Sequence, residues 1–159
     1  MAFQVGDQIA HPMHGAGVID RIESKRINGI ERDYYVLRIP VGDMLVMVPT
    51  DGCEEIGIRP IIDRETAQRI VAAMPEIVVN MTSNWNKRYR ENMLRIKSGD
   101  LMEVAHVIKG LMEREREKGL STGERKMLHS AKQILISEIV LAEESSYTQV
   151  EERINKALA

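Results

Sequence analysis

The spacing of hydrophobic residues changes once along this chain, near residue 62. Before that point, short β-branched segments alternate with turn residues, a pattern typical of a β meander. Asn28-Gly29 supplies the two positive φ angles of a type I′ turn, so we predict a hairpin around it. The alternation over residues 18–27 is imperfect, which indicates a bent or bulged strand. About five strands fit into this half, and a strand bent in this way favours closure into a small barrel.

After residue 62, hydrophobic residues recur every three or four positions, which predicts helices. Capping residues divide this half into about five helices, with expected starts at Asp63, Asn84, Asp100, Ser121 and Ser146. Ser121 and Glu124 have the spacing of a capping box. We therefore predict an α+β protein, with a β-barrel in residues 1–60 and an all-helical domain in residues 61–159.

Length and composition favour a folded protein of the cytoplasm. The chain has 159 residues, of which 43% are hydrophobic, yet no apolar run approaches the roughly 20 residues of a membrane helix. The first residues lack the features of an export signal, and the lone Cys53 fits a reducing compartment. We expect no contact with a membrane.

Motifs for catalysis are not evident. His11 and His14 offer two imidazoles near a turn, but no third ligand stands close in sequence, so we interpret them as structural. Gly15 and Gly17 lack the context of a phosphate-binding loop, and no carboxylate pair stands out. We expect no enzymatic activity, metal, cofactor or small-molecule substrate. A metal-dependent enzyme centred on His11 and His14 remains the alternative in this class.

The segment 84–97 is basic although the whole chain has a net charge of −2. Its cations are Lys87, Arg88, Arg90, Arg95 and Lys97, against the single acid Glu91. At about 100° per residue, Trp85, Tyr89, Met93 and Ile96 share an arc of roughly 80°, which favours a buried indole and solvated cations. The alternative follows from the place of Trp85 in the first turn, where the indole can project and wedge into a DNA minor groove.

Several segments resemble the CarD/CdnL family of bacterial transcription regulators. They are VGDQIAHPMHGAGVI, VLRIPVGDMLVMVP, NWNKRYR, KSGD, EREKGLSTGERKML and AKQIL, which cover nearly the whole chain in order. The resemblance implies a Tudor-like, SH3-like barrel that binds the β subunit of RNA polymerase, and a helical domain that touches promoter DNA. It also implies a cytoplasmic protein that reaches the nucleoid through the polymerase.

The same resemblance suggests which residues carry these contacts. The family's tryptophan matches Trp85, which would wedge into the minor groove without reading sequence. Basic positions near DNA match Arg90 and Arg125, and we add Lys87, Arg88 and Lys126 on charge alone. Lys25 and Met47 match polymerase-contacting positions, and we group Ile27 with them. Relatives carry a basic residue at the position of Met47, so we expect an apolar contact there in place of an ion pair.

The resulting hypothesis is a regulator that stabilises the open complex at initiation. Tethering by the barrel would raise the local concentration of the helical domain at the promoter, so weak affinity for DNA would suffice. The alternative is a protein-protein adaptor of the transcription machinery without direct DNA contact. Salt dependence separates the two, because release of counterions from phosphates weakens DNA binding as salt rises.

Overall fold

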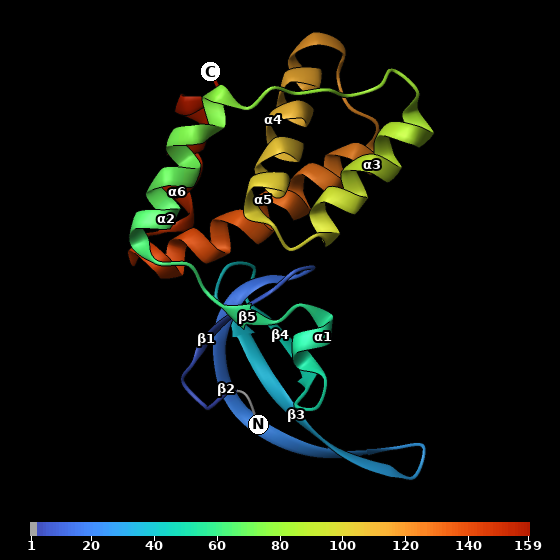
Figure 1. Cartoon of the computed structure of the whole chain (residues 1–159), viewed down its shortest axis with the longest axis vertical. Coiled ribbons are helices and arrows are strands. Elements are labelled where there is room, and N and C mark those ends of the chain that lie inside the picture. Colours follow the sequence, from blue (N-terminus) through green and yellow to red (C-terminus); the bar gives the residue numbers. More distant parts are fainter. Residues whose placement is uncertain (1–2) are drawn as a thin grey trace.

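A computed structural model describes residues 3–159, which fold into a β half and a helical half (Figure 1). The strands are β1 (Gln8–His11), β2 (Gly15–Ile27), β3 (Ile30–Ile39), β4 (Met44–Pro49) and β5 (Arg59–Pro60). The helices are α1 (Cys53–Ile56), α2 (Arg64–Ala73), α3 (Trp85–Lys97), α4 (Leu101–Lys118), α5 (Thr122–Glu143) and α6 (Tyr147–Ala157), and a 3₁₀ turn covers Met74–Glu76. The predicted α+β class is confirmed.

The five strands form one antiparallel sheet in the order β4-β3-β2-β1-β5. The predicted hairpin joins β2 to β3, and Asn28 and Gly29 have φ angles of 53° and 78°. The predicted irregularity in β2 is a shift of register between Ile19 and Arg21. β2 and β3 are longer than the sequence pattern suggested, and their hairpin extends beyond the other strands as an arm (Figure 1).

The concave side of this sheet encloses a small apolar core. Its buried members are Ile9, Ile19, Tyr35, Leu37, Ile39, Val48, Cys53 and Ile58. The short helix α1 carries the chain from the edge strand β4 to the opposite edge strand β5. The periodicity did not predict α1, because only four residues lie between Gly52 and Gly57, which both have left-handed backbone conformations.

Local capping explains where the five longer helices begin. Asp63, Asn84, Asp100 and Ser146 each accept a backbone N–H at the start of a helix, as predicted. At α5 the expected capping box is only half formed. Ser121 accepts the backbone N–H of Glu124 at 3.2 Å, but the Glu124 side chain turns into the protein interior.

The core of the helical half forms where α4 and α5 cross, and α2, α3 and α6 pack around them (Figure 1). Fully buried members include Ala105, Ile108, Leu111, Leu135, Ile139, Val150 and Ile154. These are apolar positions at three- and four-residue spacing, so burial of one stripe per helix produces the bundle.

Helix α5 also joins the two halves. Ser137 Oγ accepts the buried backbone N–H of Ala16 at 2.9 Å, and Gln133 donates to the carbonyl oxygen of Val41. Gly15 has a φ of 104°, and a Cβ there would collide with Ser137 Oγ. The glycine is therefore required both by the turn and by the close approach of α5.

Within residues 3–159, no helix combines the length and hydropathy needed to cross a membrane.

Candidate nucleic-acid interface

Trp85 is the first residue of α3 and is 42% exposed. Asn84 begins the helix, with its side chain accepting the N–H of Lys87 at 3.0 Å. No helical turn precedes Trp85 in α3, so one side of the indole is not covered by its own helix. Further along that arc, Met93 is partly buried and Ile96 is buried. The alternative of a projecting indole therefore describes this tryptophan better than burial does.

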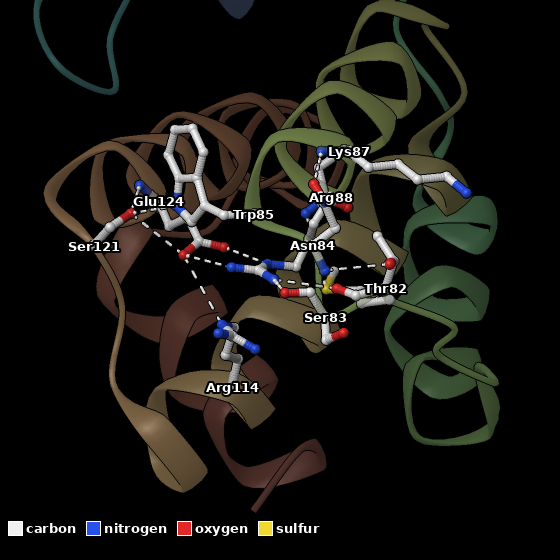
Figure 2. Close-up of polar contacts among 11 residues, drawn as sticks. Thr82, Ser83, Asn84, Trp85, Lys87, Arg88, Arg114, Ser121 and Glu124 are labelled. Carbon is white, nitrogen blue, oxygen red and sulfur yellow. Dashed lines mark hydrogen bonds and ion pairs between the residues drawn. The ribbon is translucent and has the colours of Figure 1, made fainter.

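The indole is held by three contacts, of which Figure 2 shows the hydrogen bond to Ser121. It stacks on Tyr89, with ring centroids 5.2 Å apart and an interplanar angle of 19°. Its Nε1 donates to Ser121 Oγ at 3.0 Å. Its rim lies over Gly123 in the first turn of α5, where an added Cβ would come within 3.7 Å of the indole. The exposed side chain therefore has a defined position.

Arg88 corrects a prediction, because it is buried and does not belong to a DNA-facing surface. Only 1% of the residue is exposed. Its Nε donates to Glu124 Oε2 at 2.8 Å, and its Nη1 donates to the carbonyl oxygens of Thr82 and Ser83 at 3.1 and 3.2 Å. Its donors are thus directed inward, so the assignment of Arg88 to the DNA surface, made on charge alone, was wrong.

The charge of the Glu124 carboxylate depends on the two arginines beside it, Arg88 and Arg114. Burial by itself would raise the pKa of the Glu124 carboxyl, but the hydrogen bond and charge of Arg88, with the charge of Arg114, hold that pKa below its usual value. Arg114 Nε lies 3.9 Å from Glu124 Oε1. The buried carboxylate is therefore ionised at neutral pH and matched by cations.

The other four predicted cations of this site are exposed, and they lie on two helices. On α3, the helical advance places Lys87 and Arg90 about 160° and 140° around the axis from Trp85, and Figure 2 shows Lys87 pointing away from the indole. On α5, Arg125 and Lys126 lie in the first turn. Lys126 follows Gly123 by three residues and so shares its side of the helix. Of the four, only Lys126 therefore lies on the indole's side of its helix, and Lys87 and Arg90 lie on the far side of α3.

Lys25, Ile27 and Met47 lie on one face of the sheet. Met47 pairs with Val36, which pairs with Arg21, and residues paired across strands point to the same face. Lys25 and Ile27 follow Arg21 by even steps, so they share that face. Four exposed large apolar residues lie on it in two pairs, Ile27 and Ile30 at the tip of the hairpin and Leu45 and Met47 on β4. Within residues 3–159, the outer edge of β4 pairs with no other strand.

Comparison with known proteins supports a single family across both halves. Residues 3–62 match the CarD-like/TRCF RID domain, and residues 69–155 match the C-terminal domain of CarD. The chain is also similar to the Bacillus subtilis (strain 168) protein named "Putative transcription factor YdeB". The two are 39% identical over 137 residues, which is 86% of this chain and 90% of that protein.

This chain belongs to the CarD family.

CarD membership makes the chain a transcription regulator, and the RID match associates its β half with interaction with RNA polymerase. The CarD family is one of transcription regulators and not a class of enzymes. His11 and His14 lie close together in this CarD protein, with ring centroids 4.5 Å apart. The part of the chain that the structure describes contains no group of three or more His, Cys, Asp or Glu side chains that could hold a metal ion.

Sequence reasoning missed the residues that support Trp85. The spacing of Ser121 and Glu124 predicts a capping box. The same glutamate could instead form an ion pair with a cation of the basic helix 84–97. No residue near Glu124 in the sequence indicates whether it completes the capping box or forms an ion pair. Its partner Arg88 is 36 residues away, so only the packing of α3 against α5 selects the ion pair.

Proposed function

We propose that this CarD protein binds the β subunit of RNA polymerase and contacts promoter DNA, stabilising the open complex at initiation. The observation that carries the proposal is the exposed indole of Trp85, which is fixed where the first turns of α3 and α5 meet, two helices that also carry exposed cations. An apolar wedge beside cations suits the minor groove, where inserted side chains unstack a base step at a cost of a few kcal/mol.

The remaining cations suit the phosphates that flank such a wedge. Arg90 and Arg125, with Lys87 and Lys126, are exposed and free to approach a backbone. Contacts of this kind position a protein without reading sequence. The proposed DNA contact is therefore largely independent of sequence, and it is weak because few phosphates are neutralised.

The proposed polymerase surface is the sheet face that carries Lys25, Ile27 and Met47, together with the free edge of β4. An extended strand of the polymerase β subunit can add to that edge through backbone hydrogen bonds. The exposed apolar residues then supply contacts that do not depend on charge. Such a tether raises the concentration of the helical half at the promoter.

The lifetime of open complexes tests the proposal. Trp85→Ala should shorten the lifetime that the wild-type protein confers, because a wedge that favours unwound DNA shifts the equilibrium by that preference alone. Val78→Ala provides the control, since Val78 is also an exposed apolar residue of the helical half but belongs to no predicted DNA contact. Equal stabilisation by wild type and Trp85→Ala would rule out the wedge.

The tether has its own test. Lys25→Glu combined with Met47→Glu should abolish pull-down of RNA polymerase, because both charges enter the proposed contact face. Val5→Glu, which changes an exposed apolar residue outside β2, β3 and β4, should leave pull-down intact. Retention of polymerase by the double variant would remove this face from the interface.

Two observations favour the adaptor function as a second candidate. Burial of Arg88 removes a cation from the predicted DNA surface, and the exposed apolar residues on the sheet suit a protein partner. An adaptor would assemble with polymerase in a manner insensitive to salt and without DNA. A salt slope corresponding to a few phosphates would favour DNA contact instead.

A further inference from the structure

The indole of Trp85 is the end of a polar network that continues into the protein interior (Figure 2). Ser121 Oγ accepts the indole N–H at 3.0 Å and the backbone N–H of Glu124 at 3.2 Å, and it lies 3.3 Å from Glu124 Oε1 as a donor. A serine hydroxyl has one donor and two acceptor positions, so all three are used. The Ser121 hydroxyl therefore has no hydrogen-bonding position left over, and its three bonds join Trp85 to Glu124.

Arg88 continues this network to the segment before α3. It donates two hydrogen bonds to the Glu124 carboxylate, at 2.8 and 3.3 Å, and two to the carbonyl oxygens of Thr82 and Ser83. An ion pair removed from water is tolerated only when its hydrogen-bonding groups have partners, and this one meets that condition. The pair thereby links the segment that leads into α3 with the first turn of α5.

We infer that Ser121 and the buried Arg88–Glu124 pair are positioning residues for the Trp85 indole. The pair sets the two helix starts against each other, and Ser121 then sets the orientation of the ring. This inference rests on the proposed function for the role of the indole at DNA. The positioning itself is a property of the free protein and can be measured without DNA.

The network also restricts what the indole offers to a nucleic acid. Its only hydrogen-bond donor is bound to Ser121, and one ring face is stacked on Tyr89. What remains for contact is the 42% of the residue that is exposed, and the ring's one polar atom is already bound. Recognition by Trp85 is therefore stacking and shape alone, without a hydrogen bond to a base edge.

The fluorescence of Trp85 tests the inference directly, because it is the only tryptophan in the chain. Ser121→Gly removes the indole's acceptor but retains most of the capping effect, since glycine is a tolerated N-cap residue. Loss of one hydrogen bond of ordinary strength shifts the balance between docked and undocked indole by about fivefold. We expect faster anisotropy decay and stronger iodide quenching.

Two matched variants accompany Ser121→Gly. Ser146→Gly makes the same change at the N-cap of α6 and should leave Trp85 fluorescence at the wild-type value. Ser121→Thr keeps both the hydroxyl and the helix cap, so it should give the wild-type fluorescence of Trp85. Glu124→Gln, which keeps the volume of the side chain but not its charge, should loosen the indole in the same direction. If Glu124→Gln does not fold, the comparison of Ser121→Gly with Ser146→Gly still decides the matter.

Fluorescence and open-complex lifetime together separate the possible failures. Unchanged fluorescence in Ser121→Gly would overturn the positioning inference whatever happens at the promoter. A loosened indole with a shortened lifetime supports both proposals. A loosened indole with an unchanged lifetime, where Trp85→Ala does shorten it, would show that positioning does not serve the wedge. If Trp85→Ala also has no effect, the proposed function fails while the positioning of the ring stands.

Discussion

Glu138 on α5 is bound from the β half by Arg59, whose two terminal nitrogens donate to its carboxylate at 2.6 and 2.9 Å. The backbone N–H of Ile62 donates to the same carboxylate at 2.9 Å. Glu138 is almost completely buried, so these three donors replace the hydrogen bonds that its carboxylate would make with water. Together with the Ser137 and Gln133 contacts, this carboxylate therefore fixes α5 against the β half.

Arg59→Met should destabilise the folded protein, because Glu138 would keep a buried charge with only one donor. A fully buried pair loses roughly 3–5 kcal/mol on removal of one partner, and the part-exposed Arg59 should cost somewhat less, about 2 kcal/mol. Urea unfolding measures this free energy. Arg69→Met is the control, since Arg69 pairs with Glu65 on the surface and should change stability by no more than about 0.5 kcal/mol. Equal effects would contradict a structural role for Glu138.

Gly15→Ala should be more costly than Gly29→Ala. Both glycines have positive φ angles, of 104° and 78°, so both variants carry a backbone penalty of about 1 kcal/mol. Only at Gly15 would the new Cβ collide with Ser137, and the space beside Gly29 is open. The collision should add about 1–3 kcal/mol, and thermal unfolding of the two variants gives the difference. A smaller loss in Gly15→Ala than in Gly29→Ala would mean that α5 does not approach the sheet so closely.

The same substitution should affect different properties at Arg88 and Arg90, namely folding stability at Arg88 and DNA binding at Arg90. Arg88→Met leaves Glu124 buried without its main partner and should cost roughly 3–5 kcal/mol of stability. Arg90→Met changes an exposed side chain and should cost less than about 0.5 kcal/mol, while lowering the salt dependence of promoter binding. Chemical unfolding and a salt titration of DNA binding report the two effects. A stable Arg88→Met protein with reduced DNA affinity would restore Arg88 to the DNA surface.

His11 should make the protein less stable as the solution becomes mildly acidic. Burial, together with the charge of His14, lowers the pKa of His11 to about 4, and Nδ1 of its unprotonated ring accepts the N–H of Met13 at 3.0 Å. In the unfolded chain the same pKa is near 6.5. The folded state therefore binds fewer protons between these values, so the stability present above about pH 6.5 falls as the pH drops toward 4.

His11→Gln should reduce this pH dependence, because the glutamine has no charge to gain, and the part that stays comes from His106, whose pKa burial also lowers. Free energies of unfolding at pH 7 and pH 5 are sufficient, with His129→Gln as the control at an exposed histidine. If His11→Gln loses as much stability as wild type over this range, another group is responsible for the acid sensitivity.

Local chemistry accounts for most of what could be predicted. Asn28-Gly29 forms its hairpin because those two residues tolerate positive φ angles wherever they stand in a chain. Asp63, Asn84 and Asp100 cap helices because a short polar side chain reaches its own backbone two or three residues ahead. Such interactions span a few residues, so their signal is complete within a short window of sequence.

The sequence by itself therefore determined the β half, the helical half, the bounds of the main helices and the resemblance to the CarD family. Only the tertiary structure decided which basic residue of α3 is buried and whether Trp85 is exposed. Arg88 and Arg90 are equivalent in charge, and they differ because Glu124 comes from a helix 36 residues away. Trp85 shares the apolar arc of Ile96, and it is exposed because the first turn of α3 lies at the edge of the bundle. Burial depends on which distant surfaces meet, and this information is not contained in the period of any single helix.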